Sequence, residues 1–173
     1  MDAAGNNGLW VTNGTAAGTC ELTNISGADP GGLNPSGLTV FNNEVLFSGY
    51  DAPPNNSFFD GDPMGFWVTN GTAAGTYELT NISGANSVGL HPIFLTVFNN
   101  EVLFNGFDAA GQRGLWVTNG TAAGTYELTN ISGAWSGGIF PSGLTVFNNE
   151  VLFSGYDAPP TWPFLTATPW AFG

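Results

Sequence analysis

Hydrophobic and polar positions follow one another in short runs along this chain, and no segment of useful length shows the spacing of an amphipathic helix. Apolar and polar residues alternate over residues 77–82, which is typical of a half-buried strand. Residues 38–41 and 44–47 are almost continuously apolar, and Asn42 and Asn43 between them favour a tight turn. The pattern predicts an all-β protein of short antiparallel strands.

This pattern occurs three times. VTNGTAAGT begins at residues 11, 68 and 117, and LTVFNNEVLF begins at residues 38, 95 and 144. Both strings return after 57 and then 49 residues. The additional residues of the longer interval fall between Asp51 and Trp67, and an insertion confined to one place indicates a surface loop. We therefore predict repeats of about 49 residues with four short strands each.

The apolar strands indicate sheets that are covered on both faces, and a β-propeller provides that environment. The alternative is a β-trefoil, which has three four-stranded units and closes without a partner. The chain opens in mid-unit, because residues 2–5 match residues 108–111, so complementary strand pairs stand near its two ends. Three blades are fewer than the roughly four to eight of an ordinary ring. We predict a homodimer that forms a six-bladed ring.

The repeats form a single predicted domain over residues 1–157, with units at about 1–51, 52–108 and 109–157. Residues 158–173 leave the pattern as a divergent C-terminal tail. Its large aromatic residues would be costly to expose, so we expect the tail to cover a sheet edge or a blade face. These residues are Trp162, Phe164 and Trp170.

Residues 8–19 and their two copies resemble a bacterial repeat family named for its Glu-Leu-Trp-x-x-Asp-Gly-Thr signature. The resemblance implies propeller-like blades in tandem on exported proteins, with no established chemistry. The chain differs from the signature in having Gly for Glu and Asn for Asp; the residues are Gly8, Gly65 and Gly114, and Asn13, Asn70 and Asn119. No signal peptide is visible in residues 1–7, yet we expect an extracellular or cell-surface location.

Charge excludes several functions. The formal charge is −12, with Arg113 as the one basic residue besides a single His, so binding to nucleic acid or to anionic membranes is not expected. No apolar run reaches the roughly 20 residues of a membrane-spanning helix. One Cys and one His cannot build a zinc cluster, and no cofactor is predicted.

Catalysis is also not expected. The acidic residues mostly repeat in every unit, whereas paired-carboxylate chemistry needs two acids in different environments. Asp108 begins a hairpin-like turn and is predicted to brace it by accepting backbone N–H bonds. Asp60 and Asp62 in the inserted loop are weak candidates for Ca²⁺, although a solvated acidic loop is the simpler interpretation.

The loops differ between units while the strands are copied, which indicates a rigid scaffold with variable tips. Aromatic, amide and charged side chains in these loops are the mixture that binds sugars in propeller and trefoil lectins. The candidate ligand-binding residues are Trp135, Arg113, Trp116, Asp29, His91 and Asn86. For the repeated tryptophans, packing between blades is the stronger interpretation.

The predicted function is a non-enzymatic, lectin-like module that binds a glycan or another cell-surface ligand at several sites. The alternative is a structural or protein-interaction segment of a bacterial surface or adhesin protein.

Overall fold

The computed structural model describes residues 6–52 and 64–159. The possible Ca²⁺ ligands Asp60 and Asp62 lie outside the described residues, as do the aromatic residues of the tail, Trp162, Phe164 and Trp170.

All regular structure in this part of the chain is β, apart from one short 3₁₀ turn, η1 (Ala16–Gly18), so the all-β prediction is confirmed. The strands are β1 (Trp10–Thr12), β2 (Thr19–Glu21), β3 (Ser36–Phe41), β4 (Glu44–Tyr50), β5 (Met64–Thr69), β6 (Thr76–Glu78), β7 (Ile93–Phe98), β8 (Glu101–Phe107), β9 (Arg113–Thr118), β10 (Thr125–Glu127), β11 (Ser142–Phe147) and β12 (Glu150–Ser154). They form four antiparallel sheets: β1-β2, β3-β4-β5-β6, β7-β8-β9-β10 and β11-β12.

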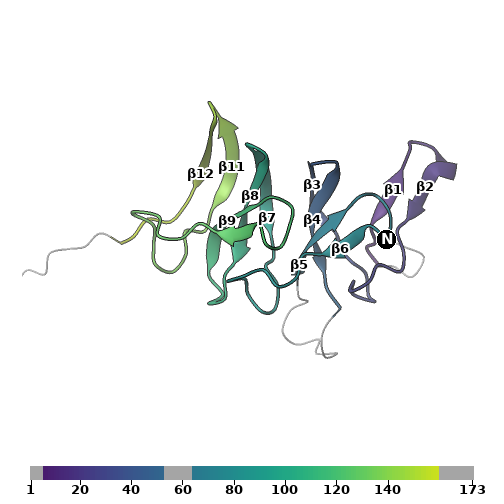
Figure 1. The fold of residues 1–173 in the computed structure, drawn as a ribbon, viewed down its shortest axis with the longest axis horizontal. Coiled ribbons are helices and arrows are strands. Elements are labelled where there is room, and N and C mark those ends of the chain that lie inside the picture. The colour runs from purple at the N-terminus through teal and green to yellow at the C-terminus, as the bar shows by residue number, and fades with distance from the viewer. Residues whose placement is uncertain (1–5, 53–63, 160–173) are drawn as a thin grey trace, which may run out of the picture.

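The four sheets follow one another in a row, with the two-stranded sheets at opposite ends (Figure 1). Each four-stranded sheet takes its first two strands from one copy of the apolar string and its last two from the next Trp-containing copy. Neither a closed ring nor a trefoil is present in the described residues. The propeller and the trefoil therefore both stay predictions.

Asparagine residues shape the turns. Asn42 and Asn43 have φ of 48° and 64°, the left-handed conformation that a two-residue hairpin turn between β3 and β4 requires. In the turn before β6, Asn70 Oδ1 accepts hydrogen bonds from the N–H and the hydroxyl of Thr72, at 3.1 and 2.7 Å. Asn and Asp share this acceptor oxygen, so the turn tolerates Asn where the resembling family has Asp.

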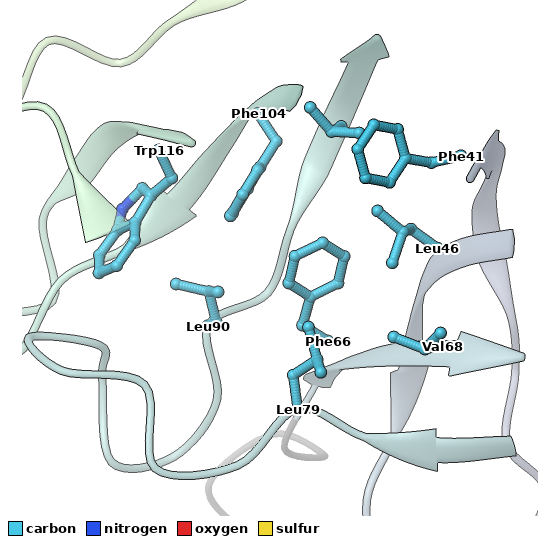
Figure 2. Packing of buried hydrophobic residues seen from close by; sticks show 9 residues of the cluster. Phe41, Leu46, Phe66, Val68, Leu79, Leu90, Phe104 and Trp116 are labelled. Atoms are coloured by element: carbon cyan, nitrogen blue, oxygen red, sulfur yellow. The ribbon is translucent and has the colours of Figure 1, made fainter. Parts of the chain in front are cut away.

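The larger of two buried clusters lies between the two four-stranded sheets (Figure 2), and the smaller one contains Phe47 and Trp67 with Leu9 and Leu33. Phe66 of β5 and Phe104 of β8 meet across this interface with ring centroids 4.9 Å apart. Trp116 is fully buried and stacks on Phe104 of the neighbouring strand, and Trp67 makes the same contact with Phe47. Burial of these side chains, at about 25 cal/mol per Å² of apolar surface, holds the sheets together.

Candidate functional site

A hollow of about 390 Å³ opens between the sheet β7-β8-β9-β10 and the hairpin β11-β12, and we call it the Arg113 hollow. Its walls are Ile93, Phe94, Asn105, Phe107, Arg113, Phe140, Pro141, Ser142, Ser154 and Tyr156. Aromatic rings and a few convergent polar groups are the usual composition of a small-molecule site.

Arg113, at the start of β9, is fixed in this wall. Its guanidinium carbon lies 3.7 Å from the centre of the Phe107 ring, a cation–π contact. Its Nη1 donates to Asn105 Oδ1 at 2.9 Å and to the His91 carbonyl oxygen at 3.1 Å. Asn105 in turn donates from Nδ2 to the carbonyl oxygen of Pro141, 2.8 Å away. The cation is thus held by one wall of the hollow, and Asn105 links that wall to the other at Pro141.

The electrostatic surroundings of Arg113 are unusual because none of its three hydrogen-bond partners is a carboxylate: they are the Asn105 amide, the His91 carbonyl and, 3.5 Å from Nη2, the His91 Nδ1. No carboxylate of the described residues forms an ion pair with it, and burial lowers the pKa of the guanidinium. Burial and the charge of Arg113 both lower the pKa of His91, whose imidazole is therefore neutral at pH 7. An anionic group entering the hollow would meet a positive charge without a competing carboxylate.

Three aromatic side chains extend the wall beyond the hollow. Phe140 and Tyr156 have ring centroids 5.1 Å apart, and Trp135 stacks on Phe140 at 6.1 Å. Trp135 is 40% exposed and Tyr156 is 59% exposed, so their rings are open to solvent. Tyr156 also borders a smaller, more open hollow with Trp135 and Asp157. We call Trp135, Phe140 and Tyr156 the aromatic shelf, and it lies next to the fixed guanidinium of Arg113.

The backbone around the Arg113 hollow is strained. His91, Phe94 and Phe140 have φ of 47°, 60° and 50°, a region that bulky side chains seldom adopt. The first unit carries Asn34 in place of His91 and Phe140, and the first and third units carry Gly37 and Gly143 in place of Phe94. Those residues accept a positive φ more easily. The strain thus coincides with the aromatic wall, as is common at functional sites.

The structure separates the other predicted ligand-binding residues. Trp116 is fully buried in the core, so it has no surface to offer a ligand, and packing explains it. Asp29 and Asn86 accept backbone N–H bonds from Gly31 and Val88 in their own turns. Asp29, Asn86 and Trp135 stand at the same position of three successive units. Of these three side chains, Trp135 is the one that belongs to the aromatic shelf.

Sequence reasoning missed Asn105, Phe107, Phe94, Phe140 and Tyr156. A signal for part of this set is present when the units are compared. Asn105 stands where the other units have Ser48 and Ser154, and Arg113 stands where they have Asn7 and Met64. The two departures from the repeat are hydrogen-bonded to each other.

A second hollow, of about 380 Å³, contains a pair of carboxyl groups. Asp51 Oδ1 accepts from Trp67 Nε1 at 2.8 Å, and Asp51 also contacts Glu78. Burial first, and the charge of Glu78 second, raise the pKa of Asp51 to about 7. The carboxylate of Asp51 lies where a Cβ on Gly65 would be, so glycine at this signature position makes room for it.

The equivalent acid of the next unit has a structural role. Asp108 Oδ1 accepts from the N–H groups of Ala110 and Gln112 at 2.9 and 2.7 Å, so its predicted bracing role is confirmed. Trp116 Nε1 is left buried without a hydrogen-bond partner among the described residues. Within residues 6–52 and 64–159, no three His, Cys, Asp or Glu side chains gather closely enough to hold a metal ion.

Comparison of the chain with protein-family models, curated proteins and solved structures finds no match. The described part of the chain contains no helix long and apolar enough to cross a bilayer.

Proposed function

We propose that the protein is a non-enzymatic, lectin-like module that binds a sugar in the Arg113 hollow. The observation that carries this proposal is the fixed guanidinium of Arg113 beside strained and exposed aromatic residues. A scaffold that needed only stability would place Gly or Asn at the positions of Phe94 and Phe140, as the first unit does with Gly37 and Asn34.

The chemistry of the walls suits a pyranose ring. The apolar face of a sugar stacks on aromatic rings, and here Tyr156 and Trp135 are exposed for that contact. The N–H groups of Arg113 and the hydroxyls of Ser142 and Ser154 can meet the ring substituents. Because Arg113 has no carboxylate partner among the described residues, a sugar that carries a carboxylate is the favoured ligand.

The same walls supply no acid or base for hydrolysis, since no Asp or Glu of the described residues lines the Arg113 hollow. Glycoside hydrolysis needs two carboxyl groups on either side of the scissile bond. Binding without turnover therefore fits the composition of the site.

The test is a binding titration by calorimetry with galacturonic acid and with galactose. We expect Tyr156→Ala to weaken binding by about tenfold, which is the loss of one stacking contact of about 1.4 kcal/mol. Tyr126→Ala is the matched control, because Tyr126 is exposed on β10 and does not line the hollow. Equal losses in the two variants, or no binding of either sugar at millimolar concentration, would contradict the proposal.

The second candidate is a structural or protein-interaction segment of a bacterial surface protein. The open sheet edges of β1 and β12 among the described residues favour it, because an unpaired edge is a template for another strand. Both candidates place the protein outside the cell or on its surface.

A further inference from the structure

The two-stranded sheets are the two halves of one four-stranded sheet. In the complete sheets, β5 pairs with β4 and β6, and β9 pairs with β8 and β10. Strand β1 is the equivalent of β5 and β9 but pairs only with β2, and β12 is the equivalent of β4 and β8 but pairs only with β11. Among the described residues, each half thus has one open edge that is paired in the complete sheets, on β1 in one half and on β12 in the other. Each of these two strands is the equivalent of the partner that the other lacks.

Side chains at these edges are exposed where their copies are buried. Trp10 is 48% exposed, whereas Trp67 and Trp116 are fully buried. Leu152 is 53% exposed, whereas Leu46 is fully buried in the core and Leu103 is partly buried. Covering such apolar surface is favourable by about 25 cal/mol per Å².

The complete sheets define the register that the halves would adopt. Leu46 lies opposite Val68 and Phe47 opposite Trp67, and Leu103 and Phe104 pair with Val117 and Trp116 in the same way. Transferred through the repeat, this register sets Leu152 opposite Val11 and Phe153 opposite Trp10.

We infer that β12 of one copy pairs with β1 of a second copy in this register, so that two chains assemble head to tail. The halves lie at opposite ends of the row of sheets (Figure 1), so a second copy, and not the same chain, brings them together. Two copies would have six four-stranded sheets, whereas one or three copies would have three or nine. Six lies within the roughly four to eight blades of closed propellers.

The junction can also form a hydrogen bond that the sheet β3-β4-β5-β6 makes; the sheet β7-β8-β9-β10 lacks it, because Trp116 Nε1 has no partner among the described residues. Asp51 bridges to Ala28 and accepts from Trp67 Nε1 of the adjacent strand. Asp157 already makes the equivalent bridge to Ala134, but β12 has no neighbouring strand among the described residues that would bring a tryptophan to it. In the inferred register, the indole of Trp10 from the second copy occupies that place and can donate to Asp157.

Disulfide trapping tests both the partner and the register. The background variant is Cys20→Tyr, which removes the exposed native thiol and restores the residue of the other two units. Leu79 N donates to Phe66 O, so the backbone groups of Phe66 and Val68 point toward β6. Leu46 and Val68 therefore form a non-hydrogen-bonded pair, whose side chains are close enough for a disulfide.

Val11→Cys with Leu152→Cys reproduces that pair across the junction, and the control Val11→Cys with Ser154→Cys is displaced by two residues. We expect mild oxidation to give covalent dimers about five times faster with the first pair, because only its side chains face each other. Mixing the two single variants, Val11→Cys and Leu152→Cys, should give the same dimer. A disulfide within one chain, no disulfide, or equal rates for the two pairs would overturn the inference.

A second measurement does not depend on new cysteines. Light scattering after gel filtration should give a mass near twice 18.0 kDa for the unchanged chain. Trp10→Ala alters a side chain that is exposed in the single copy, so the fold should persist while the mass shifts toward 18.0 kDa. A mass of 18.0 kDa for the unchanged chain at tens of micromolar would contradict the assembly.

Discussion

Replacing Asp51 by asparagine should remove a pH-dependent loss of stability. In the unfolded chain this carboxyl has its ordinary pKa of 3.8, whereas in the folded protein burial and the charge of Glu78 raise the pKa to about 7. Between these values the folded state binds more protons than the unfolded state. The contribution of Asp51 to the free energy of unfolding should therefore be highest below about pH 4. This contribution should fall as the pH rises toward 7 and stay constant above that pH.

The magnitude follows from the difference between the two pKa values. The full difference corresponds to about 4 kcal/mol for a group without solvent contact. The carboxyl of Asp51 borders an open hollow, and solvent screening reduces the effect to about 1–2 kcal/mol. In Asp51→Asn, the amide oxygen of the new side chain would still accept the bond from Trp67 Nε1, and the amide carries no charge to repel Glu78. We expect this variant to be more stable than the wild type by about 1 kcal/mol at about pH 8.

Urea unfolding monitored by tryptophan fluorescence at about pH 5, 6.5 and 8 measures this effect at a fixed protein concentration. Asp108→Asn is the matched control, because Asp108 stands at the same position of the next unit and accepts two backbone N–H bonds. That variant should lose about 1 kcal/mol and keep the decline with pH. Wild-type stability that rises over this pH range, or a decline that Asp51→Asn leaves unchanged, would refute the reasoning.

Three further changes test other parts of the structure. Phe94→Gly should raise the free energy of unfolding by about 0.5–1 kcal/mol, because Phe94 has a positive φ, and urea unfolding measures this effect. The same variant should weaken sugar binding, which calorimetry measures. A lower stability of the variant would contradict the assignment of strain. Asn70→Ala removes the acceptor of two hydrogen bonds in the turn before β6 and should cost about 1 kcal/mol in the same unfolding assay, whereas Asn70→Asp should cost less than half of that. Arg113→Lys keeps the charge but loses the planar fork, so the affinity for galacturonic acid should fall about tenfold in a titration while that for galactose changes by less than about threefold.

The repeats, their turns and their all-β character could be predicted from local sequence. Asn-Asn and Asn-Gly pairs determine turn geometry within a few residues. The apolar strings predict the strands, but only part of their burial: β4 is buried, whereas Leu38 and Val40 of β3 are 55% and 73% exposed, so the expectation that these strands are covered on both faces is wrong for β3. The bracing role of Asp108 was likewise predictable, because the N–H groups that donate to it lie two and four residues further along the chain. These features depend on hydrogen bonds between residues that are close together in the sequence, so the residue types alone are enough to predict them.

The candidate site depends on contacts between distant segments. Arg113 and Trp135 were named from their residue types, but the stacking of Arg113 on Phe107 requires the pairing of β8 with β9. The hydrogen bond from Asn105 to Pro141 joins residues 36 positions apart. Trp116 was named as a ligand residue beside Arg113, yet side chains alternate between strand faces, and packing against Phe104 takes its ring into the core.

The most direct test of sugar binding uses the fact that the chain contains a single arginine. With ¹⁵N-labelled arginine, the Nε–Hε group of Arg113 gives one side-chain signal in a two-dimensional NMR spectrum. Titration with galacturonic acid should shift this signal in a saturable manner, and Tyr156→Ala should raise the concentration at half-saturation by about tenfold. A signal that does not move at millimolar galacturonic acid, or that moves equally with sodium acetate, would contradict a sugar site in the Arg113 hollow.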